Sequence, residues 1–253
     1  MKIDDLPHPG LVKKQSAWEL RGWTNDDRSR VVDGSLQVTC VPRRQGMQSG
    51  SGFFSQSQRM FPCDEATVSY EVFFPDSFTW VKGGKVGFGF GLGDGDEYAS
   101  GADWENRCGS VRTMWREGGQ AIGYLYLPKE GLSRDGVIRA QSKAFQASCE
   151  GSLGKPAGID VFFKNRAGLS FTKGWNSVSV HVKLNAPGKN DGVYRLTVNG
   201  VTRELTDVKY RNNGSIHING VIFSTFFGGS SGEWACTTPQ RISFRRVQVV
   251  TPS

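Results

Sequence analysis

Hydrophobic and polar residues alternate with a period of two in several parts of the chain. The alternation is clearest at residues 178–183, where three valines are separated by Ser179, His181 and Lys183. The same rule is followed in part at residues 67–74, 192–198 and 241–250. Because successive side chains of a strand point to opposite faces, this period predicts strands with one buried face. No stretch keeps a helical period for long, and we expect only short helical turns, for instance near residues 94–104.

Turn-forming residues separate the predicted strands. Glycine and asparagine pairs stand between them, as at Gly118–Gly119 and Asn199–Gly200. Many short strands with such turns predict an all-β fold, which we interpret as a β-jelly-roll sandwich of two antiparallel sheets with a concave substrate groove. No repeat or linker divides the chain, so residues 1–253 are interpreted as a single β-jelly-roll domain, with residues 1–15 as a loosely packed N-terminal arm. Residues 133–158 are polar and contain glycine, and we expect a long loop there.

The charge balance adds a preference for partners. The formal net charge is +7, which favours a nucleic acid, an acidic membrane face or an acidic polysaccharide, although it also fits solubility alone. No run of about 18 apolar residues is present, so we expect no membrane partner. The basic residues are dispersed and match no nucleic-acid-binding motif, so we expect no nucleic-acid partner either. The five cysteines form no C-x-x-C pair, and a zinc site is therefore not expected.

Residues 85–91 have an unusual alternation. Lys85 shares one phase with three glycines, whereas Val86, Phe88 and Phe90 share the other. The second phase is expected to be buried. Glycine weakens a strand, so a row of glycines indicates the close approach of either a ligand or another layer of the protein. The sequence leaves both alternatives open.

Two further segments place polar side chains on one face each. Ser110 and Arg112 share a phase in residues 109–115, and Tyr124 and Tyr126 share a phase in the next predicted strand. Residues 116–120 lie between them and are typical of a hairpin loop. If the two strands pair, Ser110 and Arg112 lie across from the two tyrosines. This face is either an ordinary solvated sheet face or a site that contains a guanidinium, a hydroxyl and two phenols.

Lys, Arg and Tyr together, without a pair of carboxylates, suit β-elimination at a uronic acid. Arginine can bind and neutralise the carboxylate through two parallel hydrogen bonds, which makes the neighbouring C5 proton removable. A base then removes this proton, and an acid protonates the departing O4. Nearby cations are expected to lower the pKa of a tyrosine toward the working range. One tyrosine can act as base and acid, or two can divide the work.

At these residues the chain resembles the alginate and glucuronan lyases of polysaccharide lyase family fourteen. The matching pieces are Lys82–Lys85, Ser110 to Trp115, Tyr124 to Pro128, Trp175 to Asn185, Asn190 to Val193, Asn199–Gly200, Gly220 to Gly229 and Trp234. They extend over roughly residues 60–250. The chain reads Lys-Val-Gly-Phe at residues 85–88, where the family commonly has Lys-Leu-Pro-Gly.

The resemblance implies a metal-free and cofactor-free lyase that acts on an acidic polysaccharide outside the cell, as a secreted or extracellular monomer. Its catalytic group corresponds here to Lys85, Ser110, Arg112, Tyr124 and Tyr126. Lys85 is preferred to Lys82 as the catalytic lysine because it shares a face with the glycines. We expect Lys82 and His181 to bind substrate, His181 because it lies on the polar phase of its strand.

Other classes fit the sequence less well. A glycosidase needs two carboxylates at the bond, and the densest acidic stretch, residues 94–97, reads as a solvated loop or as a calcium loop. A serine hydrolase would need a G-x-S-x-G motif, which is absent from the sequence. A non-catalytic carbohydrate-binding module of lectin type would use the same sheet, the same charge and exposed aromatic residues such as Trp80 or Trp104.

Overall fold

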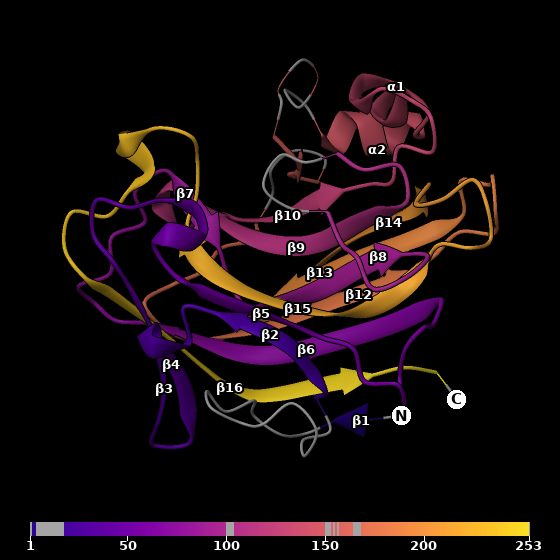
Figure 1. Cartoon of the computed structure of the whole chain (residues 1–253). Coiled ribbons are helices and arrows are strands. Elements are labelled where there is room, and N and C mark those ends of the chain that lie inside the picture. The colour runs from indigo at the N-terminus through magenta and orange to yellow at the C-terminus, as the bar shows by residue number, and fades with distance from the viewer. Residues whose placement is uncertain are drawn as a thin grey trace.

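The computed structural model describes residues 2–3, 18–99, 104–149, 153, 155, 157–163 and 168–252. These residues form two antiparallel eight-stranded sheets packed face to face (Figure 1). The first sheet contains β1 (Lys2–Ile3), β3 (Ser29–Val32), β4 (Ser35–Cys40), β6 (Glu65–Phe74), β12 (Gly174–Lys183), β13 (Gly192–Val198), β14 (Val201–Val208) and β16 (Gln240–Val250). The prediction of a β-jelly-roll sandwich is confirmed.

The second sheet carries the residues of interest. It contains β2 (Leu20–Thr24), β5 (Ser51–Ser55), β7 (Gly83–Lys85), β8 (Phe88–Gly93), β9 (Cys108–Arg116), β10 (Ala121–Tyr126), β11 (Ile159–Val161) and β15 (His217–Phe227). Its order is β11-β10-β9-β7-β15-β5-β2, and β8 pairs with both β9 and β15. The hairpin between β9 and β10 passes through the short 3-10 helix η3 (Glu117–Gly119), where the sequence predicted a loop. Three more 3-10 turns are described: η1 (Asp26–Arg28), η2 (Gly46–Gln48) and η5 (Gly232–Trp234).

The core lies between the two sheets. Strand β6 alternates regularly between buried and half-buried residues, as its period of two predicts. Aromatic rings fill the space between the layers: Phe88 of β8 contacts Tyr70 of β6 and Phe223 of β15, with ring centres 5.3 and 4.8 Å apart. Burying such rings contributes most of the favourable free energy of a sandwich of this kind. All five cysteines are described, and none forms a disulfide.

Residues 133–158 differ from the predicted loop, because two short helices form within them. Helix α1 (Arg134–Arg139) begins after Ser133, whose side chain accepts a hydrogen bond from the amide of Gly136. Helix α2 (Lys143–Ser148) begins after Ser142, which caps it in the same way. Buried Ile138 and Phe145 attach the helices to the domain, on the side of β9 and β10 (Figure 1). No described helix has the length and apolar character needed to cross a bilayer.

Two other predicted segments lie only partly within the described residues. Within the predicted N-terminal arm, residues 2–3 pair with β16 as β1, and the remainder of residues 1–15 lies outside the described residues. The helical turn expected near residues 94–104 is not found at residues 94–99, which form bends and irregular backbone, and residues 100–103 lie outside the described residues.

The glycine row from residue 85 to residue 91 is interrupted at Gly87. This residue has φ +75°, which ends β7 and turns Gly87 toward the core, where an added Cβ would lie 2.5 Å from the Tyr70 ring. An added Cβ at Gly91 would lie 2.9 Å from the Phe54 ring. The glycines therefore make room for the protein's own side chains, and the interpretation that they leave space for a ligand is wrong at these two positions.

Candidate functional site

The pairing of β9 with β10 brings the predicted residues together. Arg112 pairs with Tyr124, and Ser110 pairs with Tyr126. All four side chains point away from the core between the sheets and are nonetheless buried. The face is therefore not an ordinary solvated sheet face. The period of two in each strand, together with the short hairpin, was sufficient to predict this arrangement.

Lys85 joins this group from β7. Its Cα is paired with that of Met114 on β9, and its side-chain nitrogen lies 4.2 Å from the centre of the Tyr124 ring. The same nitrogen lies 5.1 Å from the centre of the Phe226 ring on β15. Lys85 is buried as well. Residues of four strands thus enclose one amine beside two phenols.

The polar atoms of the site are arranged around one peptide oxygen. The hydroxyl of Ser110 donates a hydrogen bond of 2.8 Å to the carbonyl oxygen of Ala99, and Nη2 of Arg112 donates one of 3.2 Å to the same atom. Nε of Arg112 is buried and has no hydrogen-bond partner among the described residues. Arg112 is thus a buried cation with a donor still available, which is a suitable arrangement for binding an anion.

The two phenols contact each other and the chain that follows α2. Their hydroxyl oxygens are 3.4 Å apart. The amide of Gly158 donates a hydrogen bond of 2.9 Å to the Tyr124 hydroxyl, and a Cβ at residue 158 would lie 2.7 Å from the Tyr124 ring. The absence of a side chain at Gly158 therefore permits this contact.

Burial determines the charge states of the site. It lowers the pKa of Lys85 well below the ordinary 10.5, and the nearby charges of Arg112 and Arg116 lower it further. Burial also raises the pKa of Tyr124, and Tyr126 raises it further. The expectation that neighbouring cations lower the pKa of the tyrosine is wrong for Tyr124, because burial disfavours the phenolate and the nearby Tyr126 and Asp160 act in the same direction.

Two predicted substrate-binding residues lie elsewhere. Lys82 precedes β7 and is 47% exposed, and it forms an ion pair with Glu233. His181 lies in β12 of the first sheet, where its Nδ1 is 2.9 Å from the hydroxyl of Thr67. The polar phase of β12 faces away from the second sheet, so the structure does not place His181 beside Lys85 and the tyrosines.

Several residues at the site were not predicted from the sequence. Tyr98 stands beside Arg112, whose Cζ is 5.7 Å from the ring centre. Trp104 contacts Tyr126 with a ring separation of 5.6 Å. Arg116 continues the row of Ser110 and Arg112 along β9 and forms an ion pair with Asp160 of β11. Arg116 could have been found by extending the alternation of β9, and Trp104 was singled out only as an aromatic residue of the lectin-type alternative. Tyr98 and Asp160 have no evident signal in the sequence.

The acidic stretch at residues 94–97 is engaged with basic side chains. Asp94 forms an ion pair with Arg107, and Asp96 forms one with Arg21. Among the described residues, no group of three or more His, Cys, Asp or Glu side chains is arranged to hold a metal ion. The solvated-loop interpretation of this stretch therefore fits the structure better than the calcium-loop interpretation.

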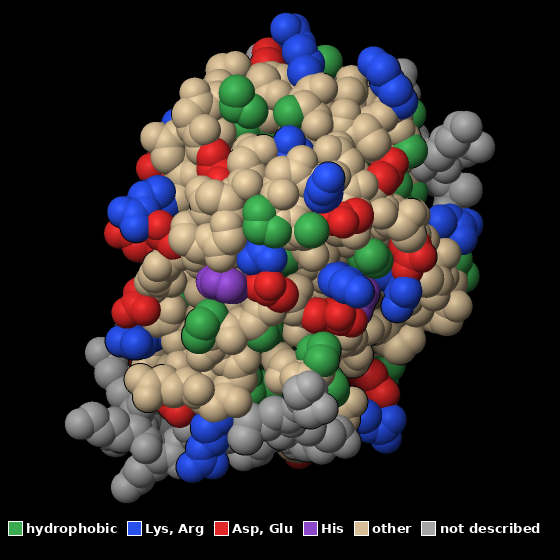
Figure 2. Space-filling model, turned by 90° about the vertical axis from the view of Figure 1, so that its right-hand side faces the viewer, with side chains coloured by type: hydrophobic (Ala, Val, Ile, Leu, Met, Phe, Trp, Pro, Cys, Tyr) green, Lys and Arg blue, Asp and Glu red, His purple; other side chains and the backbone are tan. Residues whose placement is uncertain are grey.

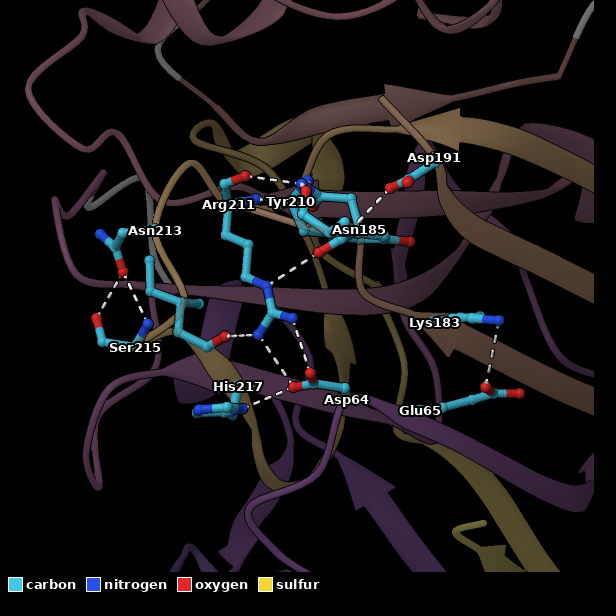
Figure 3. A network of polar contacts seen from close by, with 12 residues as sticks. Asp64, Glu65, Lys183, Asn185, Asp191, Tyr210, Arg211, Asn213, Ser215 and His217 are labelled. Carbon is cyan, nitrogen blue, oxygen red and sulfur yellow. Dashed lines mark hydrogen bonds and ion pairs between the residues drawn. The ribbon is translucent and has the colours of Figure 1, made fainter. Parts of the chain in front are cut away.

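A second polar cluster lies away from the candidate site and connects loops (Figure 3). Buried Arg211 donates hydrogen bonds of 3.0 and 2.8 Å to the two carboxylate oxygens of Asp64, and one of 3.1 Å to the carbonyl oxygen of Asn185. Nδ1 of His217 lies 2.6 Å from Asp64. Arg211 and His217 both lower the pKa of Asp64. The many backbone partners of this cluster indicate a structural role.

The charge on the surface is mixed. On the face in Figure 2, Lys and Arg side chains stand beside Asp and Glu rather than forming one continuous cationic area. The ion pairs Arg195–Glu204 and Lys183–Glu65 on the first sheet are examples. The basic side chains of this face are therefore dispersed, as the basic residues of the sequence are.

Comparison with known proteins places the chain in a family. The family model described as Polysaccharide lyase 14 matches residues 28–247. The curated relative named Exolysin, from Paramecium bursaria Chlorella virus 1, is 26% identical over 185 residues, which are 67% of this chain and 27% of that protein. The chain thus spans about a quarter of the length of this relative.

Two solved structures are similar to the whole fold. The marine PL-14 alginate lyase from Aplysia kurodai has a TM-score of 0.80 and 24% identity, with 100% of this chain and 98% of that chain covered. An alginate lyase from Chlorella virus has a TM-score of 0.72 and 25% identity, with 93% of each chain covered. Because the family model extends over most of the sequence, the chain belongs to polysaccharide lyase family 14.

Proposed function

We propose that this protein cleaves a uronate-containing polysaccharide by β-elimination and that alginate is the polymer. The two solved structures compared above are named alginate lyases, which supports alginate ahead of glucuronan. The observation that carries the proposal is the convergence of Ser110 and Arg112 on the carbonyl oxygen of Ala99. Donors that already meet at one oxygen are suited to hold the oxygen of a uronate carboxylate.

Binding of the carboxylate is the first step. Arg112 and Ser110 bind and neutralise it, and Arg112 supplies the positive charge. Neutralisation stabilises the negative charge that develops when the C5 proton is removed. For this binding the substrate oxygen takes the position of the Ala99 carbonyl. Lys85, which is enclosed by the same strands, contributes a further nitrogen beside the sugar.

Proton transfer is the second step. A base removes the C5 proton, the electrons of that bond form the C4–C5 double bond, the C4–O4 bond breaks, and O4 accepts a proton. The raised pKa of Tyr124 keeps its phenol protonated, so we assign Tyr124 as the proton donor to O4. Two groups can take the C5 proton. One is Tyr126 as its phenolate, whose oxygen lies 3.4 Å from the Tyr124 hydroxyl, and the other is the neutral amine of Lys85, which the lowered pKa of Lys85 favours.

An absorbance assay tests the proposal. β-Elimination creates an unsaturated uronate that absorbs ultraviolet light, whereas hydrolysis or simple binding does not. Polymannuronate, polyguluronate and glucuronan should be compared from neutral to alkaline pH, with polymer binding measured in parallel. We expect absorbance to rise with an alginate block. Binding without any rise in absorbance on the three polymers would identify a non-catalytic carbohydrate-binding module instead.

A further inference from the structure

Arg116 is a second arginine on the face of β9 that carries Ser110 and Arg112. It lies two residues beyond Met114 on the same phase, and its side chain is only 16% exposed. The backbone beside it leaves room for this side chain, because a Cβ at Gly83 would lie 3.3 Å from Cδ of Arg116. Arg116 therefore lies within the site face and not on the open surface.

Asp160 determines the direction of the Arg116 side chain. It forms an ion pair with Nη2 of Arg116, and its own side chain is 21% exposed. In the sheet, Asp160 pairs with Tyr124. The ion pair thus directs the guanidinium back along the sheet toward the proposed proton donor. The charge of Arg116 is also close enough to Lys85 to contribute to its lowered pKa.

Trp234 covers the other side of the guanidinium. Its ring centre is 5.4 Å from Cζ of Arg116, within the range of a cation–π contact. The ring is half-buried, and only glycine fits beneath it, because a Cβ at Gly229 would lie 2.0 Å from Cγ of Trp234. The ion pair between Lys82 and Glu233 holds the adjacent turn.

We propose that Arg116, oriented by Asp160 and covered by Trp234, binds the carboxylate of a uronate residue beyond the one that is cleaved. This inference rests on the proposed function and extends it to substrate selection. A guanidinium fork recognises a carboxylate, and an indole ring offers an apolar face to a sugar ring, so the pair suits a carboxylated sugar and not a neutral one. Lys82 then acts indirectly, through the turn that carries Trp234.

Stability alone is a weaker explanation of this arrangement. An ion pair needs only the guanidinium and the carboxylate, and it does not require the Trp234 ring over the guanidinium. Four separate segments nevertheless converge here, from β7, β9, β11 and η5. This packing requires glycine at residues 83 and 229, because a Cβ at either position would collide with neighbouring atoms, although glycine costs conformational entropy on folding.

The test compares oligouronates of increasing length. We expect Arg116→Gln and Trp234→Ala to raise KM about tenfold or more for long oligomers and to leave KM for the shortest cleaved oligomer unchanged. Arg116→Gln combined with Asp160→Asn removes both charges and avoids an unpaired carboxylate. Arg195→Gln, which breaks a similar ion pair with Glu204 on the first sheet, is the matched control and should leave all lengths unaffected.

Equal KM changes at all lengths would overturn the inference, since Arg116 would then act at the sugar that is cleaved or on the fold. Thermal unfolding separates these two cases, and Arg116→Lys provides a second variant that keeps the charge but loses the fork. If the wild-type protein cleaves no uronate polymer, the proposed function fails. In that case the affinity of wild type and Arg116→Gln for intact polymannuronate still tests the inference, and equal affinities would refute it.

Discussion

The side-chain nitrogen of Lys85 faces the ring of Tyr124 at 4.2 Å from its centre. The lysine thus contacts the aromatic face of the phenol, while the amide of Gly158 contacts its hydroxyl. Burial lowers the pKa of Lys85 and raises the pKa of Tyr124. Both shifts favour the neutral forms, a free amine and a protonated phenol, in place of the phenolate that the sequence suggested.

Removal of the Tyr124 hydroxyl should abolish most turnover. We expect Tyr124→Phe to lower kcat by about 100-fold or more, the range of a lost general acid, while polymer affinity stays measurable. Tyr126→Phe should lower kcat as far if Tyr126 is the base and should stay near native if Lys85 is the base. Steady-state absorbance kinetics and calorimetric binding check this. Tyr210→Phe removes a buried hydroxyl bonded to the Val193 carbonyl, away from the site, and serves as control. A near-native rate in Tyr124→Phe would refute its assignment as the proton donor.

Arg112→Lys should be strongly impaired. A lysine keeps the charge, but it cannot hold a carboxylate with two parallel hydrogen bonds or match the position of Nη2 on the Ala99 carbonyl. We expect kcat/KM to fall about tenfold or more. The matched control is Arg107→Lys, because Arg107 is exposed and forms its ion pair with Asp94 at the surface. An Arg112→Lys enzyme as active as this control would contradict the proposed role of the fork.

Asp64 should make stability depend on pH in the acidic range. Its pKa lies below the ordinary 3.8 because of Arg211 and His217, so its contribution is complete above 3.8 and is lost as pH falls through the lowered folded value. We expect the difference in unfolding free energy between wild type and Asp64→Asn to shrink across that window. Urea unfolding from about pH 5 to about pH 2 measures it. A difference that stays constant would show that this pKa is not lowered.

Activity should survive a chelator. The task of neutralising the carboxylate is assigned to Arg112 and Ser110, and the carboxylates of Asp94 and Asp96 are paired with arginines. We therefore expect the rate on alginate to be the same before and after treatment with EDTA. A loss of rate that calcium restores would show that a bound cation takes part.

The faces of the strands could be predicted from the sequence, whereas burial and the irregular segments could not. Alternation in two strands and a short hairpin placed Ser110 and Arg112 opposite Tyr126 and Tyr124, because strand pairing and side-chain period follow from local pattern. The same rule failed at Gly87, where a positive φ turned the residue to the other face. The backbone at Gly87 depends on packing between the two layers, here against the Tyr70 ring, which no local pattern of the sequence indicates.

Short helices and distant partners also escaped prediction. Helices α1 and α2 are six residues each, too short for a clear period, although Ser133 and Ser142 are typical caps. Asp160 lies on a three-residue strand that follows the polar stretch of residues 133–158, so nothing nearby in sequence connects it with Arg116. The pKa of Tyr124 was predicted in the wrong direction because the sequence gives charges but not the depth at which they are buried.

The peptide oxygen of Ala99 affects how binding strength should be interpreted. Because the Ser110 hydroxyl and Nη2 of Arg112 already donate to it, these two donors are satisfied in the empty enzyme. A ligand oxygen that takes this position replaces the Ala99 carbonyl as the acceptor. The measured affinity is therefore the difference between the free energy of the hydrogen bonds to the ligand and that of the hydrogen bonds to Ala99. Weak binding of a small carboxylate would therefore reflect competition from the enzyme's own backbone. A longer polymer makes additional contacts, and their binding free energy favours displacement of the Ala99 carbonyl.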